Sequence, residues 1–248
     1  MRNLDYLYDR EWYNDVYYPL LERKERRKIL YGSRDTGKSL FIAQRLVLDC
    51  LTLDYFKCIL IRKQYNTIKE SQWETIKQVI EDWDLLPFFD LLKSPLEIRC
   101  SNGNRFISRG MDDPAKAKSI KDPTHAWYEE ADQLSLLDFE TTTLSLRNSR
   151  GIKIQEYFSF NAGNPKMWIV KEFFPPLKTF ERADGMHTNV ESIQPDTLIM
   201  HTCYKHNQFI TDDRVQIYKS LKSRKPETYK MDGLGLFGTN VEGLIYPD

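Results

Sequence analysis

The chain alternates between short apolar runs, which are typical of buried strands, and longer segments whose apolar residues recur at helical spacing. The first such unit is a strand-like run at 28–31, a glycine-containing turn at 32–37 and a helix at 38–51. A second apolar strand at 58–62 precedes a helix with large apolar residues on one face. These residues are Trp73, Ile76, Ile80 and Trp83. Two apolar strands separated by a helix indicate a parallel sheet built from βαβ units.

The remaining apolar runs extend this α/β pattern. Core strands are predicted at 124–130, 154–165 and 197–204. Helices are predicted at about 135–147 and at 212–223, and the tail contains a strand-like run at 244–246. The fold class expected from this order is α/β, with a mainly parallel central sheet flanked by helices.

Residues 96–110 differ from the βαβ units and predict a β-hairpin inserted in the fold. Two short β-type runs flank the dipeptide Asn102-Gly103, which favours the positive φ angles of a tight hairpin turn. The polar segment at 112–123 that follows is expected to be an exposed loop.

Charge and cysteine content narrow the possible partners. Lys plus Arg and Asp plus Glu both total 36, so one copy has no net positive charge that would attract nucleic acid. Any nucleic-acid contact must therefore use a local patch or several copies. The four cysteines lie far apart without metal-ligand spacing, which favours buried reduced thiols. No apolar stretch is long enough to span a membrane, so a soluble intracellular protein is expected.

The turn after the first strand fits the phosphate-binding pattern GxxxxGK[ST] in full. Its glycines let backbone N–H groups face a β-phosphate at the start of the following helix. Lys38 is expected to bridge the β- and γ-phosphates, and the Ser39 hydroxyl to bind Mg²⁺. The strand before the motif and the helix after it strengthen the assignment. The predicted nucleotide-binding residues are Gly32, Ser33, Arg34, Asp35, Thr36, Gly37, Lys38 and Ser39.

Two adjacent carboxylates end the strand at 124–130. A P-loop enzyme that hydrolyses ATP needs an acid for Mg²⁺ and a base that orients the attacking water. We assign Glu129 to the metal or its water shell and Glu130 to the water. Because Glu129 stands where an aspartate is usual, the division of labour between the two stays open. Two solvated acids at a strand end are the alternative.

The strand at 154–165 ends in the sequence FNAGNP. Asn161 or Asn164 could reach the γ-phosphate or the water and sense its loss, although asparagine and glycine are also ordinary turn residues. A catalytic carboxylate beside a P-loop, with a further strand ending in a polar residue, predicts the additional-strand (ASCE) class of P-loop NTPases.

Taken together, these motifs resemble the ATPase domain of the large terminase subunit, the DNA-packaging motor of tailed bacteriophages. The resemblance lies in the order of GSRDTGKS, LIRKQYNTIKESQW, SNGNRFISRGMDDPAKAKSI, WYEEADQLS and FNAGNP, and it spans nearly the whole chain. It implies an ATP- and Mg²⁺-dependent translocase that moves double-stranded DNA into a procapsid in the host cytoplasm. The implied partners are DNA, a portal protein and a small terminase subunit, with a ring of copies when docked and a monomer in isolation.

The resemblance also suggests how the chain is divided. We expect an N-terminal lead-in at 1–27, an ATPase core at 28–205, and a lid with a linker at 206–248. In this family a nuclease domain follows, so nuclease activity is not expected from this chain alone.

The chain departs from the family in how it would recognise adenine, and it leaves the charge-neutralising cation open. The family's glutamine upstream of the P-loop is missing, so Tyr13, Tyr17 or Tyr18 could contact the base. The family places a basic residue near the transition-state charge. Arg34 is the candidate within the loop, and Asp35 could steer it by a charge-assisted hydrogen bond. Candidates acting across subunits are Arg109, Lys116 and Lys118.

Two other functions remain open at this point. One is a helicase-like or other nucleic-acid translocase that works without a capsid. The other is a nucleotide-gated scaffold that binds nucleotide without turnover, although the Glu129-Glu130 pair favours an enzyme.

Overall fold

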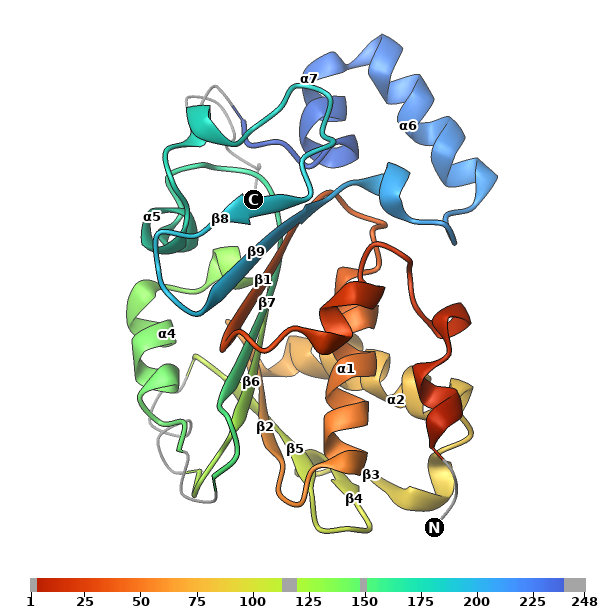
Figure 1. The fold of residues 1–248 in the computed structure, drawn as a ribbon, viewed down its shortest axis with the longest axis vertical. Coiled ribbons are helices and arrows are strands. Elements are labelled where there is room, and N and C mark those ends of the chain that lie inside the picture. The colour runs from red at the N-terminus through yellow and green to blue at the C-terminus, as the bar shows by residue number, and fades with distance from the viewer. Residues whose placement is uncertain (1–3, 113–119, 148–150, 239–248) are drawn as a thin grey trace.

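A nine-stranded sheet with helices on both faces forms the centre of the molecule (Figure 1). The computed structural model describes residues 4–112, 120–147 and 151–238, and the strand count refers to these ranges. The strand order is β3-β4-β5-β2-β6-β7-β1-β9-β8. The strands are β1 Arg27–Gly32, β2 Lys57–Arg62, β3 Phe89–Lys93, β4 Leu96–Cys100, β5 Arg105–Gly110, β6 His125–Glu129, β7 Gln155–Asn161, β8 Asn189–Glu191 and β9 Thr197–Thr202. In this spatial order, each pair of neighbouring strands from β5 to β9 is parallel, whereas the pairs β3-β4, β4-β5 and β8-β9 at the two edges are antiparallel. This arrangement confirms the predicted fold class.

Helices cover both faces of the sheet (Figure 1). Those described are α1 Lys38–Thr52, α2 Glu74–Asp82, α4 Leu136–Thr143, α5 Trp168–Phe173, α6 Asp212–Arg224 and the one-turn α7 Pro226–Thr228. Helices α1 and α2 lie on one face and α4 and α5 on the other, while α6 and α7 stand beyond one end of the sheet (Figure 1). Each face has its own apolar core, as expected for a sheet buried on both sides.

The N-terminal lead-in packs into the same core as α1 and α2. It consists of short 3₁₀ turns, and its Leu7, Tyr13, Tyr17 and Leu20 are buried in that core. The segment before β1 is therefore a structural part of the α/β domain.

The hairpin at 96–110 forms β4 and β5, but its turn differs from the prediction. Gly103 has a φ of +92°, whereas Asn102 is not among the residues with positive φ. The Asn102 side chain instead accepts a hydrogen bond from the Asn104 backbone N–H at 3.0 Å and donates to the Cys50 carbonyl at 2.9 Å. These bonds tie the turn to the end of α1, which a local turn pattern does not reveal.

Some predicted elements end earlier than expected, and several short ones were missed. Strand β7 stops at Asn161, and α4 stops at Thr143 because the chain bends back until the Arg147 N–H bonds the Pro123 carbonyl at 2.7 Å. The missed elements include β3, β8, α5 and the one-turn α7. The strand-like run at 244–246 lies outside the described residues.

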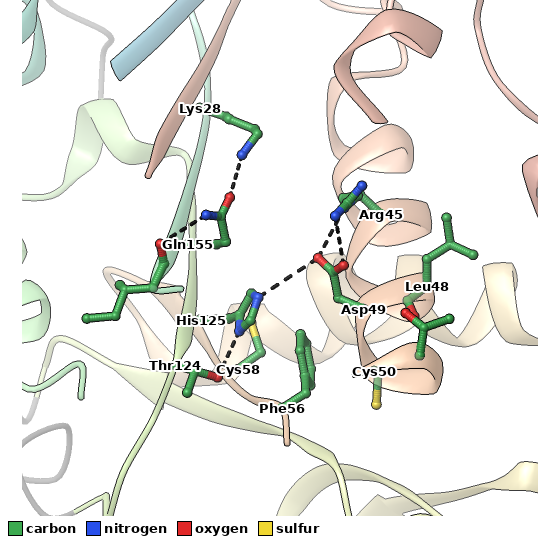
Figure 2. A network of polar contacts seen from close by, with 12 residues as sticks. Lys28, Arg45, Leu48, Asp49, Cys50, Phe56, Cys58, Thr124, His125 and Gln155 are labelled. Atoms are coloured by element: carbon green, nitrogen blue, oxygen red, sulfur yellow. Dashed lines mark hydrogen bonds and ion pairs between the residues drawn. The ribbon is translucent and has the colours of Figure 1, made fainter. Parts of the chain in front are cut away.

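A buried polar network lies at the amino-terminal edge of the parallel strands (Figure 2). Arg45 Nε donates to Asp49 Oδ2 at 3.1 Å within α1. His125 Nε2, at the start of β6, is 3.9 Å from that same oxygen, and Lys28 hydrogen-bonds Gln155. These groups stand at the edge opposite to the one where β1, β6 and β7 end.

Candidate functional site

The carboxyl ends of β1, β6 and β7 bring the predicted site residues together. Strand β7 lies between β1 and β6, and the register places Asn161 beside Gly32 and Ser159 beside Glu129. The strand that precedes the P-loop is thus separated from the strand with the two acids by one additional strand. This arrangement is the one that defines the predicted additional-strand class.

The P-loop leaves the sheet at a place where only glycine fits. Gly32 has a φ of +141°, and a Cβ built on it would lie 1.8 Å from the Thr202 carbonyl oxygen of β9. The next residue, Ser33, donates its backbone N–H to that same carbonyl at 3.0 Å. The loop then runs into the N-terminus of the 15-residue helix α1, where free N–H groups and the helix dipole favour an anion.

Lys38 is buried at the base of this loop. Its ammonium donates to the Ser33 carbonyl, to Thr36 Oγ1 at 3.2 Å and to Asn161 Oδ1 at 3.2 Å. Burial lowers the pKa of Lys38 to about 8, and the nearby carboxylate of Glu129 opposes this shift. A negative charge placed beside this buried ammonium would stabilise its protonated form, so the loop favours the binding of phosphate.

Glu129 connects the P-loop to β7 through its two carboxylate oxygens. Ser39 Oγ donates to Oε1 at 2.7 Å, and Ser159 Oγ donates to Oε2. The Trp127 indole N–H in turn donates to Ser159 Oγ at 2.9 Å. Burial raises the pKa of Glu129, and the hydrogen bonds from Ser159 and Ser39 partly counter the rise.

Glu130 has a different environment from Glu129, although the two are adjacent in sequence. Its backbone is left-handed, with φ and ψ both 50°, which turns the chain sharply after β6. Its side chain is 43% exposed and forms an ion pair with Arg62 at the end of β2. Close by, burial raises the pKa of Asp132 to about 6, with further contributions from the negative charges of Glu130 and Glu129.

Two neighbouring cavities open at this edge of the sheet. One, of about 320 Å³, is lined by P-loop residues from Arg34 to Ser39 together with Glu129, Glu130 and Asn161. The other, of about 760 Å³, is lined by Arg34, Glu130, Asp132, Asn161 and Asn164, among others. Arg34, Glu130 and Asn161 line both cavities, so they stand where the two meet.

The donor set fits a magnesium-bound nucleoside polyphosphate. Backbone N–H groups at a helix start and the Lys38 ammonium suit phosphate oxygens. The Ser39 hydroxyl and the Glu129 carboxylate are hard oxygen ligands that Mg²⁺ accepts, and they already lie 2.7 Å apart. These two residues could hold the metal.

Other predicted residues take different positions. Asn164 lines the larger cavity, but its Oδ1 accepts the Lys166 N–H at 2.8 Å within a turn. Arg109 is partly buried near the end of β5, and its Nη1 donates to the Ser108 carbonyl at 2.7 Å. Lys116 and Lys118 lie outside the described residues.

The tyrosines proposed for adenine recognition belong mostly to the core. Tyr13 and Tyr17 are both 0% exposed, which is incompatible with stacking on a base. The Tyr17 hydroxyl contacts Thr202 Oγ1 at 2.8 Å, and its ring stacks on Phe41 at 5.2 Å. Tyr17 thus packs against the P-loop and α1. Tyr18 is partly buried, and its hydroxyl donates to the Tyr8 carbonyl at 3.1 Å.

The Asp35 carboxylate pairs with a helix far away in sequence. Its Oδ2 accepts from Arg214 Nε at 2.8 Å and from the Tyr218 hydroxyl at 2.7 Å, both on α6. The expectation that Asp35 steers Arg34 is therefore replaced by a contact between the P-loop and α6. Nothing local in GSRDTGKS could have indicated a partner 179 residues away.

Sequence reasoning also missed Arg62 and Ser159. Arg62 ends a core strand whose neighbour, β6, is followed directly by Glu130, so its position at the carboxyl edge was a usable signal. Ser159 is an ordinary serine inside an apolar strand, and only the β6–β7 register places it against Glu129.

Known proteins resemble this chain in sequence and in fold. A model of the family "Phage terminase large subunit" matches residues 24–236. The PBSX phage terminase large subunit of Bacillus subtilis (strain 168) is 28% identical over 216 residues, covering 86% of this chain and 49% of that protein. The terminase large subunit of Bacillus phage SPP1 is 26% identical over 217 residues, covering 84% and 48%. The chain thus spans about half the length of these relatives.

Solved structures of large terminases have the same fold. The large terminase of a thermophilic bacteriophage superposes with a TM-score of 0.68 at 15% identity, covering 91% of this chain and 54% of that one. The same protein in complex with ATP-gamma-S gives 0.65 at 14% identity, covering 90% and 52%. The ATPase domain of the Thermus phage P74-26 large terminase gives 0.61 at 14%, covering 87% and 90%. Because the family model covers most of its length, the chain belongs to the phage terminase large subunit family.

Proposed function

We propose that this chain is the ATP-hydrolysing motor domain of a terminase large subunit, which drives double-stranded DNA into a procapsid. The observation that carries the proposal is the hydrogen bond of 2.7 Å between Ser39 and Glu129, which joins the end of the P-loop to the acid that ends β6. Glu130 lines the same cavity, so a phosphate-binding loop, a metal-binding pair and a candidate base converge on one space. A large terminase of the same fold has been solved with ATP-gamma-S, which supports ATP as the nucleotide.

The roles follow from the positions of the side chains. Lys38 and the N–H groups at the start of α1 hold the β- and γ-phosphates, and Ser39 with Glu129 holds Mg²⁺. When bound there, Mg²⁺ would supply charge neutralisation at the phosphate oxygens. Glu130 accepts a proton from the attacking water as the bond between the γ-phosphorus and ADP breaks. Arg34 and Asn161, which line both cavities, contact the γ-phosphate.

The larger cavity is the route by which a neighbouring subunit would reach the reacting phosphate. It adjoins the nucleotide cavity at Arg34, Glu130 and Asn161. A cation entering there would complete charge neutralisation, and such a residue contributes about 10³–10⁵ in rate. Arg109, Lys116 and Lys118 remain the candidates. A ring of copies docked on a portal protein would also supply the DNA contact that the balanced charge of one copy does not.

Steady-state ATP hydrolysis and ADP binding by three variants test the proposal. Glu130→Gln should keep ADP affinity while kcat falls by about 10²–10⁴, the contribution of a general base. Lys38→Ala should weaken ADP binding by about tenfold or more, because a buried cation is lost from the phosphate site. Glu140→Gln, an exposed acid on α4, is the control and should match the wild type.

The outcomes separate the competing functions. Normal turnover in Glu130→Gln would remove this residue from the base role. Tight nucleotide binding without phosphate release by the wild type, even at high protein concentration, would favour a scaffold. Strand separation stimulated by DNA would favour a helicase. For the trans candidates, alanine variants mixed with wild-type chains should inhibit the assembly while leaving isolated-chain turnover unchanged.

A further inference from the structure

Asp35 joins the P-loop to the distant helix α6 through a single carboxylate oxygen. Oδ2 accepts hydrogen bonds from Arg214 Nε at 2.8 Å, from Arg214 Nη2 and from the Tyr218 hydroxyl at 2.7 Å. Two of these bonds come from the planar guanidinium, a donor suited to carboxylates. The hydrogen bonds to Asp35 raise the pKa of Arg214.

The backbone of Asp35 is held from the same side. Asn207, in the segment that leads to α6, donates Nδ2 to the Asp35 carbonyl at 2.8 Å. Asn207 Oδ1 in turn accepts from Asn14 Nδ2 at 3.4 Å, and Asn14 Nδ2 is 3.3 Å from the Thr36 carbonyl. The centre of the P-loop is therefore bonded to residues that flank or belong to α6 by its side chain and by its backbone.

Apart from these bonds, helix α6 packs on α7 and on one small apolar cluster. Along its full length it buries one residue, Tyr218. That ring stacks on Tyr204 at 4.3 Å in a small aromatic cluster, and its hydroxyl is one of the donors to Asp35. The helix stands beyond the end of the sheet, next to the P-loop side (Figure 1). A helix that is polar on nearly all sides depends on a few specific contacts for its position.

We propose that Asp35 is a positioning residue that docks α6 on the P-loop, so that nucleotide binding and the position of α6 are coupled. The inference rests on the proposed nucleotide-binding function of the loop. Asp35 precedes Lys38 by three residues, and its negative charge is unfavourable beside a polyphosphate unless it is neutralised. Arg214 provides that neutralisation. The ion pair between Asp35 and Arg214 thus makes the loop compatible with bound phosphate. It also holds α6 in place.

The electrostatic argument predicts an asymmetry that a merely structural contact would not give. Asp35→Asn removes the negative charge, so ADP affinity should be unchanged or tighter although α6 is released. Arg214→Gln leaves an uncompensated carboxylate beside the phosphates, so ADP should bind about three- to tenfold more weakly. The double variant should bind ADP like Asp35→Asn. Asparagine suits position 35 because its φ of 55° is left-handed, which asparagine tolerates well.

Hydrogen–deuterium exchange of residues 212–224, with and without ADP, measures the docking directly. In both single variants exchange in α6 should accelerate about tenfold, the order expected when a hydrogen bond to a charged group is lost. ADP should slow α6 exchange in the wild type but not in the variants. Arg224→Gln removes an exposed arginine at the far end of the same helix and is the control, expected to behave like the wild type.

Each result decides a separate point. Unchanged α6 exchange in both single variants would overturn the docking role. Equal loss of ADP affinity in Asp35→Asn and Arg214→Gln would overturn the charge argument. If the wild type binds no ADP, the proposed function and the coupling both fail, whereas exchange without nucleotide still reports whether Asp35 anchors α6.

Discussion

Arg62 and Glu130 form an ion pair at the wall of the cavity that the P-loop lines. Arg62 ends β2, and β2 lies on the far side of β6 from β7 and β1. Glu130 nevertheless lines the cavity of the P-loop, so the ion pair lies beside the candidate phosphate site. The pair therefore restrains the carboxylate, and we expect it to break before Glu130 can take a proton from the attacking water.

Arg62→Gln should raise the basal kcat of the isolated chain several-fold and leave ADP affinity unchanged, because Glu130 then reaches the water without breaking an ion pair. Steady-state phosphate release and ADP titration measure the two quantities. Lys63→Gln is the control: it removes the adjacent cation, whose partner is Asp138 rather than Glu130. A lower kcat in Arg62→Gln would instead mean that the arginine orients the base for reaction.

The two asparagines of FNAGNP should behave differently. Asn161 Oδ1 contacts the Lys38 ammonium at 3.2 Å, whereas Asn164 Oδ1 is engaged by the Lys166 N–H in a turn. We therefore expect Asn161→Ala to lower kcat by about 1–2 orders of magnitude, as expected when a hydrogen bond to a charged group is lost. Asn164→Ala should change kcat less than about twofold at unchanged ADP affinity. The reverse ranking would assign the sensing role to Asn164.

The fold was predictable because its determinants are local. Periodic apolar runs set β1, α1, β2, β6 and β9 to within a residue or two of their observed bounds. The short elements β3, β8 and α5 carry too few residues for a periodic pattern to distinguish them from loops. Their formation depends on neighbouring elements: β3 pairs with β4, and β8 with β9.

Local sequence patterns likewise predicted one part of the candidate site and missed another. The P-loop and the acids after β6 are contiguous in sequence, so a motif and the end of a strand located them. Partners supplied by register or by a distant helix, such as Ser159 and Arg214, leave no such local pattern. The tyrosines of the lead-in show the opposite failure, since aromatic residues near a P-loop suggested a base contact while apolar packing placed Tyr13 and Tyr17 in the core.

A glycine far from the motif should be as restrictive as the glycines within it. Gly235 has a φ of +67°, and a Cβ there would lie 2.3 Å from the Ser33 nitrogen and 2.4 Å from the Gly32 carbonyl carbon. Gly235→Ala should therefore displace the start of the P-loop and weaken ADP binding about tenfold or more, besides a backbone cost of about 1 kcal/mol.

Gly151→Ala provides a matched control for this variant. Gly151 has a similar φ of +72°, but a Cβ there would meet nothing within 4 Å. It should show the backbone cost in a denaturation curve and bind ADP normally. Equal ADP affinity in the two variants would contradict the proposed contact between Gly235 and the loop.

His125 should make the fold less stable in mild acid. Burial lowers its pKa to about 3 from an ordinary value of 6.5, and the cations Arg45 and Lys28 act in the same direction (Figure 2). The ring is therefore neutral at pH 7, and its approach to Asp49 is not a salt bridge. Between pH 6.5 and pH 3 the unfolded chain binds the proton and the folded chain does not, so stability falls as the pH falls.

From pH 7 to pH 5 this linkage should remove about 2 kcal/mol of unfolding free energy. Asp49 opposes it in part, because burial raises the pKa of this carboxyl and the folded state takes up its proton more readily. Urea denaturation at both pH values should show a smaller loss for His125→Asn, which cannot titrate, than for the wild type. Identical pH dependence in His125→Asn and the wild type would exclude His125 as the source.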